Sequence, residues 1–143
     1  MAREAQLQLL SQYENIELAE HVLDDVCRAS GIDQEIRYWV GMALREALAN
    51  AIKHGNKLNP ERRVHVRIEF NGSNDLRMIV EDEGRGFDPT TLADPTEPEN
   101  LMRASGRGVY YMRHFMDEVH FSASEHGGTR IELIKHLGSR RAS

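Results

Sequence analysis

The sequence has a single cysteine and no long apolar segment. Cys27 cannot form a disulfide within the chain, which fits a reducing compartment, and its place in an apolar helical pattern favours a small buried hydrophobe over a reactive thiol. One cysteine and seven histidines without metal-ligand spacing disfavour a structural zinc site. The N-terminus has no secretory signal pattern, and no segment approaches the length that spans a bilayer. We therefore expect a cytoplasmic protein with no membrane partner.

An excess of positive charge is also missing. The chain has 23 acidic and 18 basic residues and a formal net charge of -5, so broad attraction to nucleic acid is not expected. Any anionic ligand must be bound by local groups. With 143 residues, of which 40% are hydrophobic and 29% charged, the chain has the size and composition of one globular domain. We expect a single domain over residues 1–143, with a frayed tail at 138–143.

Hydrophobic periodicity predicts the order of the elements. Asn15 and Asp33 stand where helix N-caps are expected, and Gly31 and Gly55 stand where the two helices should end. Helices combined with hairpins predict an α+β fold, a two-layer α/β sandwich whose mixed, mainly antiparallel sheet has helices on one face. In chain order we expect a strand at 5–13, helices at 15–30 and 33–54, strands at 63–70 and 76–80, a helix at 109–116, and strands at 118–124 and 129–137.

The second helix carries Glu46 and Asn50 one turn apart, along the edge of its apolar face. They therefore point beside a core, whereas a helix that needed only solubility would place its polar residues on the opposite side. Asn50 offers the neutral oxygen that Mg²⁺ accepts when phosphates supply its negative ligands. Glu46 could accept a proton from a group that attacks a phosphate. Taken alone, an ordinary surface pair at this spacing would be the simpler interpretation.

Two glycine motifs follow the predicted hairpin. Asp82 ends a strand, where its carboxylate can accept a hydrogen bond from an exocyclic amine while Gly84 and Gly86 let the backbone approach a flat ring. Gly106 and Gly108 precede a helix, whose free N–H groups favour phosphate, and Arg107 could add charge there. The proline-containing segment 88–105 between them has the length of a functional lid, or of a solvated insertion. Each motif is weak alone, but their order is a joint pattern that chance rarely supplies.

With these motifs in this order, the sequence resembles the ATP-binding domain of the gyrase, chaperone, histidine-kinase and mismatch-repair (GHKL) superfamily. Within it, the chain is most similar to the small serine/threonine kinases that act as bacterial anti-sigma factors, of the RsbW and SpoIIAB type. The resemblance extends from about residue 7 to residue 137 and implies the Bergerat-type ATP-binding fold. Its most specific stretches are EALANAIKHGN at 46–56, VEDEGRGFDP at 80–89 and SGRGVYYMRHFMDEV at 105–119.

The resemblance implies a role for each matching residue. Glu46 would be the general base, Asn50 the Mg²⁺ ligand and Asp82 the acceptor for the adenine amino group. Thr129 would support the adenine through its hydroxyl, although a threonine at a strand start is also common without a ligand. The residues implied in the rest of the ATP or ADP site are Gly84, Gly86, Ser105, Gly106, Arg107 and Gly108.

The implied function is a switch that sequesters a sigma factor and phosphorylates a small anti-anti-sigma antagonist of the STAS type. A homodimer is also implied. Some of these kinases have an arginine immediately before Ser105, where this chain has Ala104, and whether Arg103 or Arg107 substitutes stays open. The alternative is a nucleotide-dependent binding module without phosphoryl transfer. A detached histidine-kinase domain is disfavoured because the second helix is committed to the ATP site and no dimerising four-helix segment supplies a histidine. The Arg-Arg-Ala-Ser end could be a kinase target or a solubilising tail.

Overall fold

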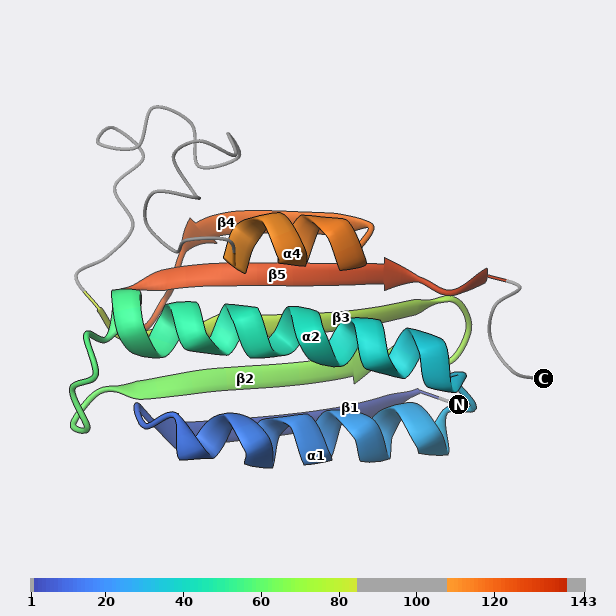
Figure 1. Ribbon diagram of the computed structural model, residues 1–143, viewed down its shortest axis with the longest axis horizontal. Coiled ribbons are helices and arrows are strands. Elements are labelled where there is room, and N and C mark those ends of the chain that lie inside the picture. Colours follow the sequence, from blue (N-terminus) through green and yellow to red (C-terminus); the bar gives the residue numbers. More distant parts are fainter. Residues whose placement is uncertain (1, 85–107, 139–143) are drawn as a thin grey trace.

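The computed structural model describes residues 2–84 and 108–138 (Figure 1). The expected loop at 88–105 and residues 139–143 of the expected tail lie outside the described residues. The elements, in chain order, are β1 (Arg3–Leu10), α1 (Glu14–Ala29), α2 (Gln34–Asn50), the π-helical turn η1 (Ala51–Gly55), β2 (Arg63–Phe70), β3 (Asp75–Glu81), α4 (Gly108–Phe115), β4 (Glu118–Ala123) and β5 (Thr129–His136).

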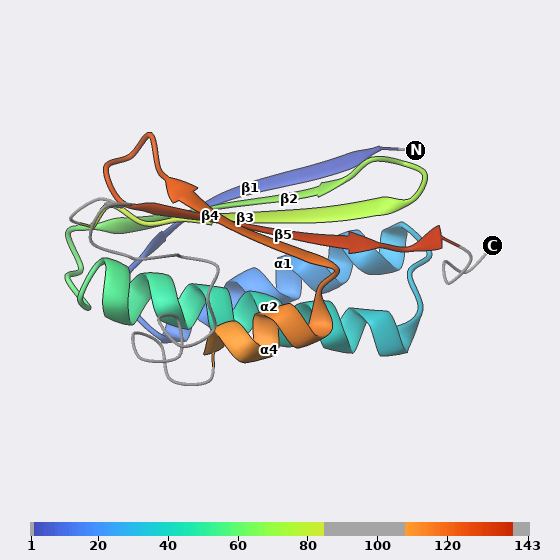
Figure 2. The same cartoon turned by 90° about the horizontal axis from the view of Figure 1, so that it is seen from above.

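The five described strands form one sheet in the order β1-β2-β3-β5-β4, with β1 at an edge as expected. All four described pairings are antiparallel. Because α1 and α2 run in opposite directions, the chain returns to the end of the sheet where β1 finished, so β2 runs back along it. Figure 2 shows α1, α2 and α4 together on one face of the sheet. The two-layer α+β sandwich is therefore confirmed.

Alternating side chains give the sheet two different faces. On β2, Val64, Val66, Ile68 and Phe70 are buried against the helices, as the sequence pattern predicts. The opposite face, which we call the outer face, has no helix over it among the described residues. Ion pairs between neighbouring charged side chains run across this face. The arginines in these pairs are Arg67, Arg77 and Arg130, and the acids are Glu69, Glu81 and Glu132.

The start of α1 differs from the expectation. The helix begins at Glu14 and Asn15 does not cap it; the Asn15 side-chain amide instead donates to the carbonyl of Leu10 at 2.9 Å, across the turn from β1. The helix ends as expected, with Gly31 in the left-handed region at φ +73°. Cys27 is fully buried on this helix, and burial raises the pKa of its thiol to about 12, which confirms a packing role. No helix in the described ranges is long and apolar enough to cross a membrane.

The second helix begins and ends where the sequence predicts, but its last turn is not α-helical. Asp33 caps α2, since its Oδ1 accepts the N–H of Ile36 at 3.0 Å. The last turn is the π turn η1, which ends at Gly55. The left-handed residues that redirect the chain come after it and are not glycines: Lys57 has φ +52° and Leu58 has φ +59°. Gly55 is therefore required for a reason other than a left-handed backbone.

Candidate functional site

The candidate site begins with the polar edge of α2. Glu46 and Asn50 are half-buried beside the core, and within the described part of the chain neither side chain makes a hydrogen bond. Arg45, next to them in sequence, turns outward and makes a two-point pair with Glu20, at 3.0 and 3.1 Å. Arg45 therefore faces solvent, whereas the side chains of Glu46 and Asn50 are left available to a ligand. The buried face of α2 beside them consists of Ile36, Val40, Ala43, Leu44, Ala47 and Leu48.

The helix widens immediately after Asn50. In η1 the N–H of Asn56 donates to the carbonyl of Ala51 at 2.8 Å, five residues back. The N–H of Leu58 then donates to the carbonyl of Ile52 at 2.8 Å. Single π turns inside α-helices are frequent at functional sites because they reposition side chains and backbone. The sequence pattern, which indicates only an apolar helix, did not predict this turn.

Asp82 is the buried acid of the site, with 2% of its surface exposed. Its Oδ1 accepts the N–H of Gly84 at 2.9 Å and the N–H of Thr129 at 3.2 Å. Burial raises the pKa of Asp82 above the ordinary carboxyl value, and these two N–H donors oppose the shift. Thr129 contacts Asp82 through its backbone, because its carbonyl also accepts the Asp82 N–H at 3.1 Å. The chain therefore holds one carboxylate oxygen firmly at the end of β3.

Three glycines make room for this carboxylate. A Cβ on Gly55 would overlap the Asp82 carboxylate, and so would a Cβ on Gly128. A Cβ on Gly84 would overlap the backbone carbonyl of Gly55. We call this arrangement of Gly55, Gly84 and Gly128 around Asp82 the glycine cradle. Sequence reasoning named Gly84 for this pocket but took Gly55 only as a helix end and did not assign Gly128; the glycine pair before Thr129 was the available signal.

Hydrogen bonds of the Asn56 side chain connect the glycine cradle to neighbouring parts of the sheet. Asn56 is completely buried, and its side-chain amide donates to Ser11 Oγ at 2.8 Å and to the carbonyl of Arg63 at 2.9 Å. Its Oδ1 accepts the N–H of Glu83, the residue after Asp82, at 2.8 Å. One carboxamide thus joins the end of η1 to β1, β2 and the turn after β3. Sequence reasoning missed this residue, because its partners lie far away in sequence.

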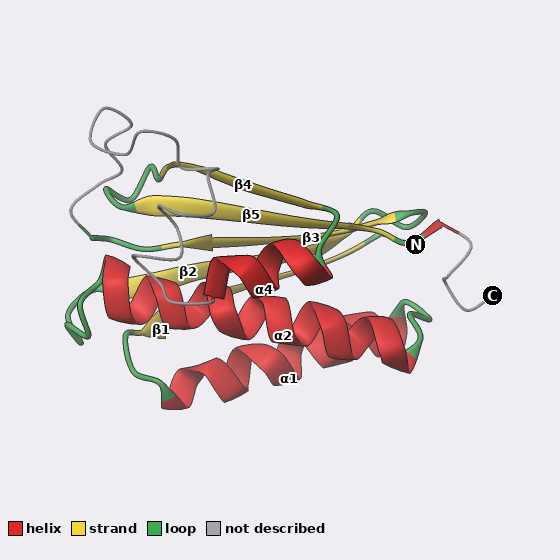
Figure 3. Ribbon diagram, turned by 45° about the horizontal axis from the view of Figure 1, so that its top comes forward, coloured by secondary structure: helices red, strands yellow, loops and turns green. Residues whose placement is uncertain are grey.

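The remaining predicted residues are only partly described. Gly108 is buried and begins α4, which lies beside α2 with its first turn next to the C-terminal half of that helix (Figures 1 and 3). The predicted Gly86, Ser105, Gly106 and Arg107 lie outside the described residues, as do Arg103 and Ala104.

The described groups lie at one end of the molecule. Asp82 packs against Gly55 at the end of η1, and Asn50 is the last residue of α2, directly before η1. A fixed acceptor in a glycine cradle suits a flat polar ring, and the carboxamide of Asn50 offers a neutral oxygen of the kind that Mg²⁺ accepts. These groups therefore offer a ligand one fixed carboxylate acceptor and two polar side chains that make no described hydrogen bond.

The chain is similar to known proteins over most of its length. A family model described as the histidine kinase-like ATPase domain matches residues 9–135. An anti-sigma F factor of Bacillus subtilis is 37% identical over 101 residues, which are 68% of this chain and 67% of the relative. An anti-sigma F factor of Anoxybacillus flavithermus is 35% identical over 101 residues, with the same coverage.

Solved structures show the same fold. The RsbU and RsbW domains of a Mycobacterium tuberculosis protein align with a TM-score of 0.68 and 17% identity over 99% of this chain. This chain spans 35% of that longer protein. A blue-light activated histidine kinase of Erythrobacter litoralis aligns with a TM-score of 0.59 and 20% identity, over 90% of this chain and 62% of the other.

Proposed function

The chain belongs to the family of histidine kinase-like ATPase domains, and from this premise we propose that it is an ATP-binding anti-sigma factor of the serine/threonine-kinase type. The observation that carries the proposal is the glycine cradle, which holds the Asp82 carboxylate against the end of the helix that bears Glu46 and Asn50. The relatives named anti-sigma F factors support the choice of partner class. We place the protein in the cytoplasm, where sigma factors act.

In the proposed site, Asp82 accepts a hydrogen bond from the adenine amino group. One of its oxygens is already fixed by two backbone N–H groups, so the carboxylate cannot rotate away from a ring placed beside it. Gly84 and Gly86 shape the base pocket, and the Thr129 hydroxyl adds a contact on the adenine side. The phosphates lie at the N-terminal end of α4, where Ser105, Gly106, Arg107 and Gly108 supply N–H groups and charge.

Asn50 holds the Mg²⁺ ion through its carboxamide oxygen, which fits because no described hydrogen bond occupies that side chain. When bound, the ion neutralises charge on the phosphates. Glu46 accepts the proton of an attacking serine or threonine hydroxyl, whose oxygen bonds to the terminal phosphorus while ADP leaves. The proposed acceptor is a small STAS-type antagonist, and a sigma factor is the sequestered target. We also propose that the protein acts as a homodimer.

The test is transfer of radiolabelled terminal phosphate from ATP to candidate STAS-domain proteins. We expect labelled antagonist with the wild-type chain and none with Asn50→Ala. An Arg45→Ala variant is the matched control, because this neighbouring side chain points outward to Glu20 and should leave transfer intact. Full transfer by Asn50→Ala would contradict the role given to that residue.

A second candidate function is a nucleotide-dependent binding switch without transfer, and Ala104 favours it. Some kinases of this type have an arginine at that position, where it can neutralise the transferring phosphate, and this chain has none there. The switch predicts tight nucleotide binding, no phosphorylated product, and partner affinity that is unchanged by Glu46→Ala. A pull-down with and without ADP, combined with the transfer assay, separates the two functions.

A further inference from the structure

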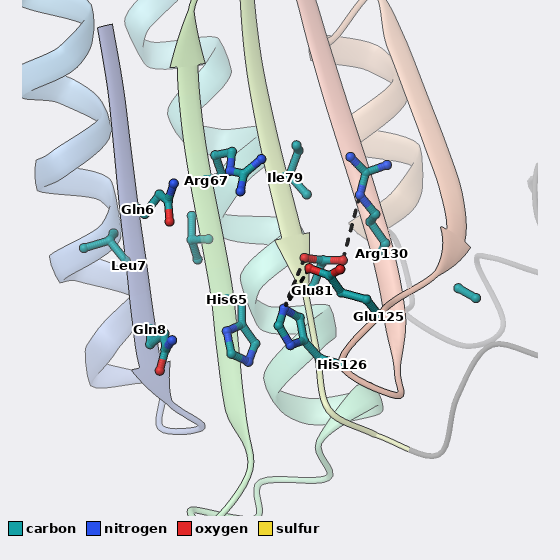
Figure 4. A pocket seen from close by; sticks show the side chains of 12 residues that line it. Gln6, Leu7, Gln8, His65, Arg67, Ile79, Glu81, Glu125, His126 and Arg130 are labelled. Atoms are coloured by element: carbon teal, nitrogen blue, oxygen red, sulfur yellow. Dashed lines mark ion pairs between the residues drawn. The ribbon is translucent and has the colours of Figure 1, made fainter.

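A second cluster of polar groups lies on the outer face of the sheet, away from the helices. Glu81 ends β3, and Glu125 and His126 lie in the turn between β4 and β5. Figure 4 shows these three side chains pointing toward one another at the edge of an open hollow of about 580 Å³. Each offers one ligand atom, and the three atoms lie within 4.8 Å of one another.

The Glu81 carboxylate is held in one orientation. Its Oε1 accepts the hydroxyl of Ser124 at 3.2 Å and lies 3.8 Å from Arg130 Nε. Its Oε2 is left facing His126 Nε2 at 3.7 Å. A partner that fixes one carboxylate oxygen orients the other toward a ligand, which is how outer contacts position metal-binding side chains.

The His126 ring is also held. It stacks on His65 of β2 with ring centroids 3.7 Å apart and 7° between the planes. The His65 ring is itself fixed by Glu83, whose Oε2 lies 2.6 Å from His65 Nε2. The backbone N–H of His126 donates to Ser124 Oγ at 2.9 Å. Contacts outside the cluster therefore set both the ring plane and the backbone of His126.

The distances are too long for direct hydrogen bonds and suit a small cation. His126 Nε2 lies 3.7 Å from an oxygen of Glu81 and 3.7 Å from an oxygen of Glu125, beyond hydrogen-bond range. Since the third side of this triangle is no longer than 4.8 Å, a point equidistant from the three atoms lies at most about 2.4 Å from each, close to the usual distance of about 2.0–2.2 Å from zinc to nitrogen or oxygen. His136 offers a contrast, because both of its nitrogens already lie 2.7–2.8 Å from carboxylate oxygens.

We propose that Glu81, Glu125 and His126 bind one divalent ion of the zinc class. One imidazole and two carboxylates suit Zn²⁺ or a similar first-row ion better than Mg²⁺, which prefers oxygen ligands alone. The hollow beside the cluster leaves room for water as the fourth ligand. The ion connects the end of β3 to the β4–β5 turn. Asp82 follows Glu81 directly, and its N–H donors are Gly84 and Thr129, the first residue after that turn.

Calorimetric titration of the nucleotide-free protein with Zn²⁺ tests the proposal, in excess Mg²⁺ so that the nucleotide site does not contribute. We expect one equivalent of Zn²⁺ to bind to the wild-type chain, and binding at least tenfold weaker in His126→Ala and in Glu125→Gln. His120→Ala is the matched control, because this exposed imidazole pairs with Glu118 on β4, outside the cluster, and should bind as the wild type does.

A second measurement guards against misfolded variants. Glu125→Gln alters an exposed side chain in a turn, so its unfolding temperature without metal should match that of the wild type. His126→Ala also loses the stacking on His65, so its response to metal is compared with its own unfolding temperature without metal. Added Zn²⁺ should raise the unfolding temperature of the wild type and of His120→Ala, but not that of His126→Ala. The proposal is overturned if the wild type binds no stoichiometric Zn²⁺, or if His126→Ala binds Zn²⁺ as tightly as the wild type does. Neither result depends on nucleotide binding or phosphoryl transfer.

Discussion

The glycine cradle can be tested by adding a single methyl group at Gly55, with Gly41 as the matched control in the same helical segment. Alanine is favoured over glycine in a helix interior by about 1 kcal/mol, a gain that applies in full to Gly41 inside α2 and only as an upper limit to Gly55, the last residue of η1. At Gly41 an added Cβ would meet nothing within 4 Å. We therefore expect Gly41→Ala to be about 0.5–1 kcal/mol more stable than the wild type, which raises the unfolding temperature by about 2–4 °C.

At Gly55 the same methyl overlaps the Asp82 carboxylate. That carboxylate is buried and held by two backbone N–H groups, so it cannot move aside without disturbing β3 or β5. Overpacking of this kind costs about 1–3 kcal/mol, which outweighs the helical gain. Gly55 does not need a left-handed backbone, so conformational strain does not contribute. We expect Gly55→Ala to be less stable than the wild type by up to about 2 kcal/mol after the gain is subtracted.

The assay is urea unfolding followed by circular dichroism, together with adenine-nucleotide affinity measured by calorimetry. Gly55→Ala should lose at least tenfold in affinity, because the Asp82 carboxylate is displaced, whereas Gly41→Ala should bind as the wild type does. The cradle argument would be refuted if Gly55→Ala gained stability as Gly41→Ala does and kept its nucleotide affinity.

Four further predictions follow from the buried groups and the helix edge. Burial raises the pKa of Asp82, so the free energy of unfolding of the wild type should fall as pH rises from the ordinary carboxyl pKa to the raised value. Urea unfolding across this pH range should show no such fall in Asp82→Asn. This variant should also bind nucleotide at least tenfold more weakly than the wild type. Asn56→Ala removes three side-chain hydrogen bonds from a buried site and should cost about 2–4 kcal/mol in urea unfolding. Glu46→Gln should slow phosphoryl transfer by about 10²–10⁴-fold and leave calorimetric nucleotide affinity nearly unchanged. Because the Cys27 thiol is buried with a pKa of about 12, iodoacetamide should label it at neutral pH only as fast as the protein unfolds.

Each of these has an outcome that contradicts it. Stability that rises with pH through that range in the wild type would show that Asp82 is better stabilised as a carboxylate than its burial implies. An Asn56→Ala variant as stable as the wild type would show that the three side-chain hydrogen bonds of Asn56 do not stabilise the fold. Loss of nucleotide binding by Glu46→Gln would assign that side chain to ligand binding. Labelling of Cys27 much faster than unfolding would show that the thiol is accessible in the native state.

The parts of the fold that depend on local patterns could be predicted from the sequence. The strand at 63–70 was predicted with its exact bounds, because strict alternation of apolar side chains in β2 has no helical interpretation. Asp33 was recognised as a cap because the hydrogen bond is made to a residue three positions away. The cap at Asn15 was wrong because its amide bonds instead to the Leu10 carbonyl of the preceding strand. A local pattern cannot choose between two partners that are both near in sequence.

The parts that depend on contacts distant in sequence could not be predicted. Gly55 at the end of a helix indicates a cap, and only its contact with Asp82, 27 residues later, gives it another role. Asn56 donates to Ser11, which lies 45 residues earlier in the chain. The outer-face cluster brings Glu81 to a turn more than 40 residues further along, through the pairing of β3 with β5. The roles given to Glu46, Asn50 and Asp82 came from the resemblance and stay predictions until ligand binding is measured.

The cradle also limits how this protein can be re-engineered. Since the space around Asp82 exists only where three side chains are missing, a larger residue at 55, 84 or 128 would overlap Asp82 or the Gly55 carbonyl. Changing the proposed preference for adenine to one for guanine therefore requires a change of the acid itself, and its replacement must still accept the two backbone N–H groups that now bind Asp82.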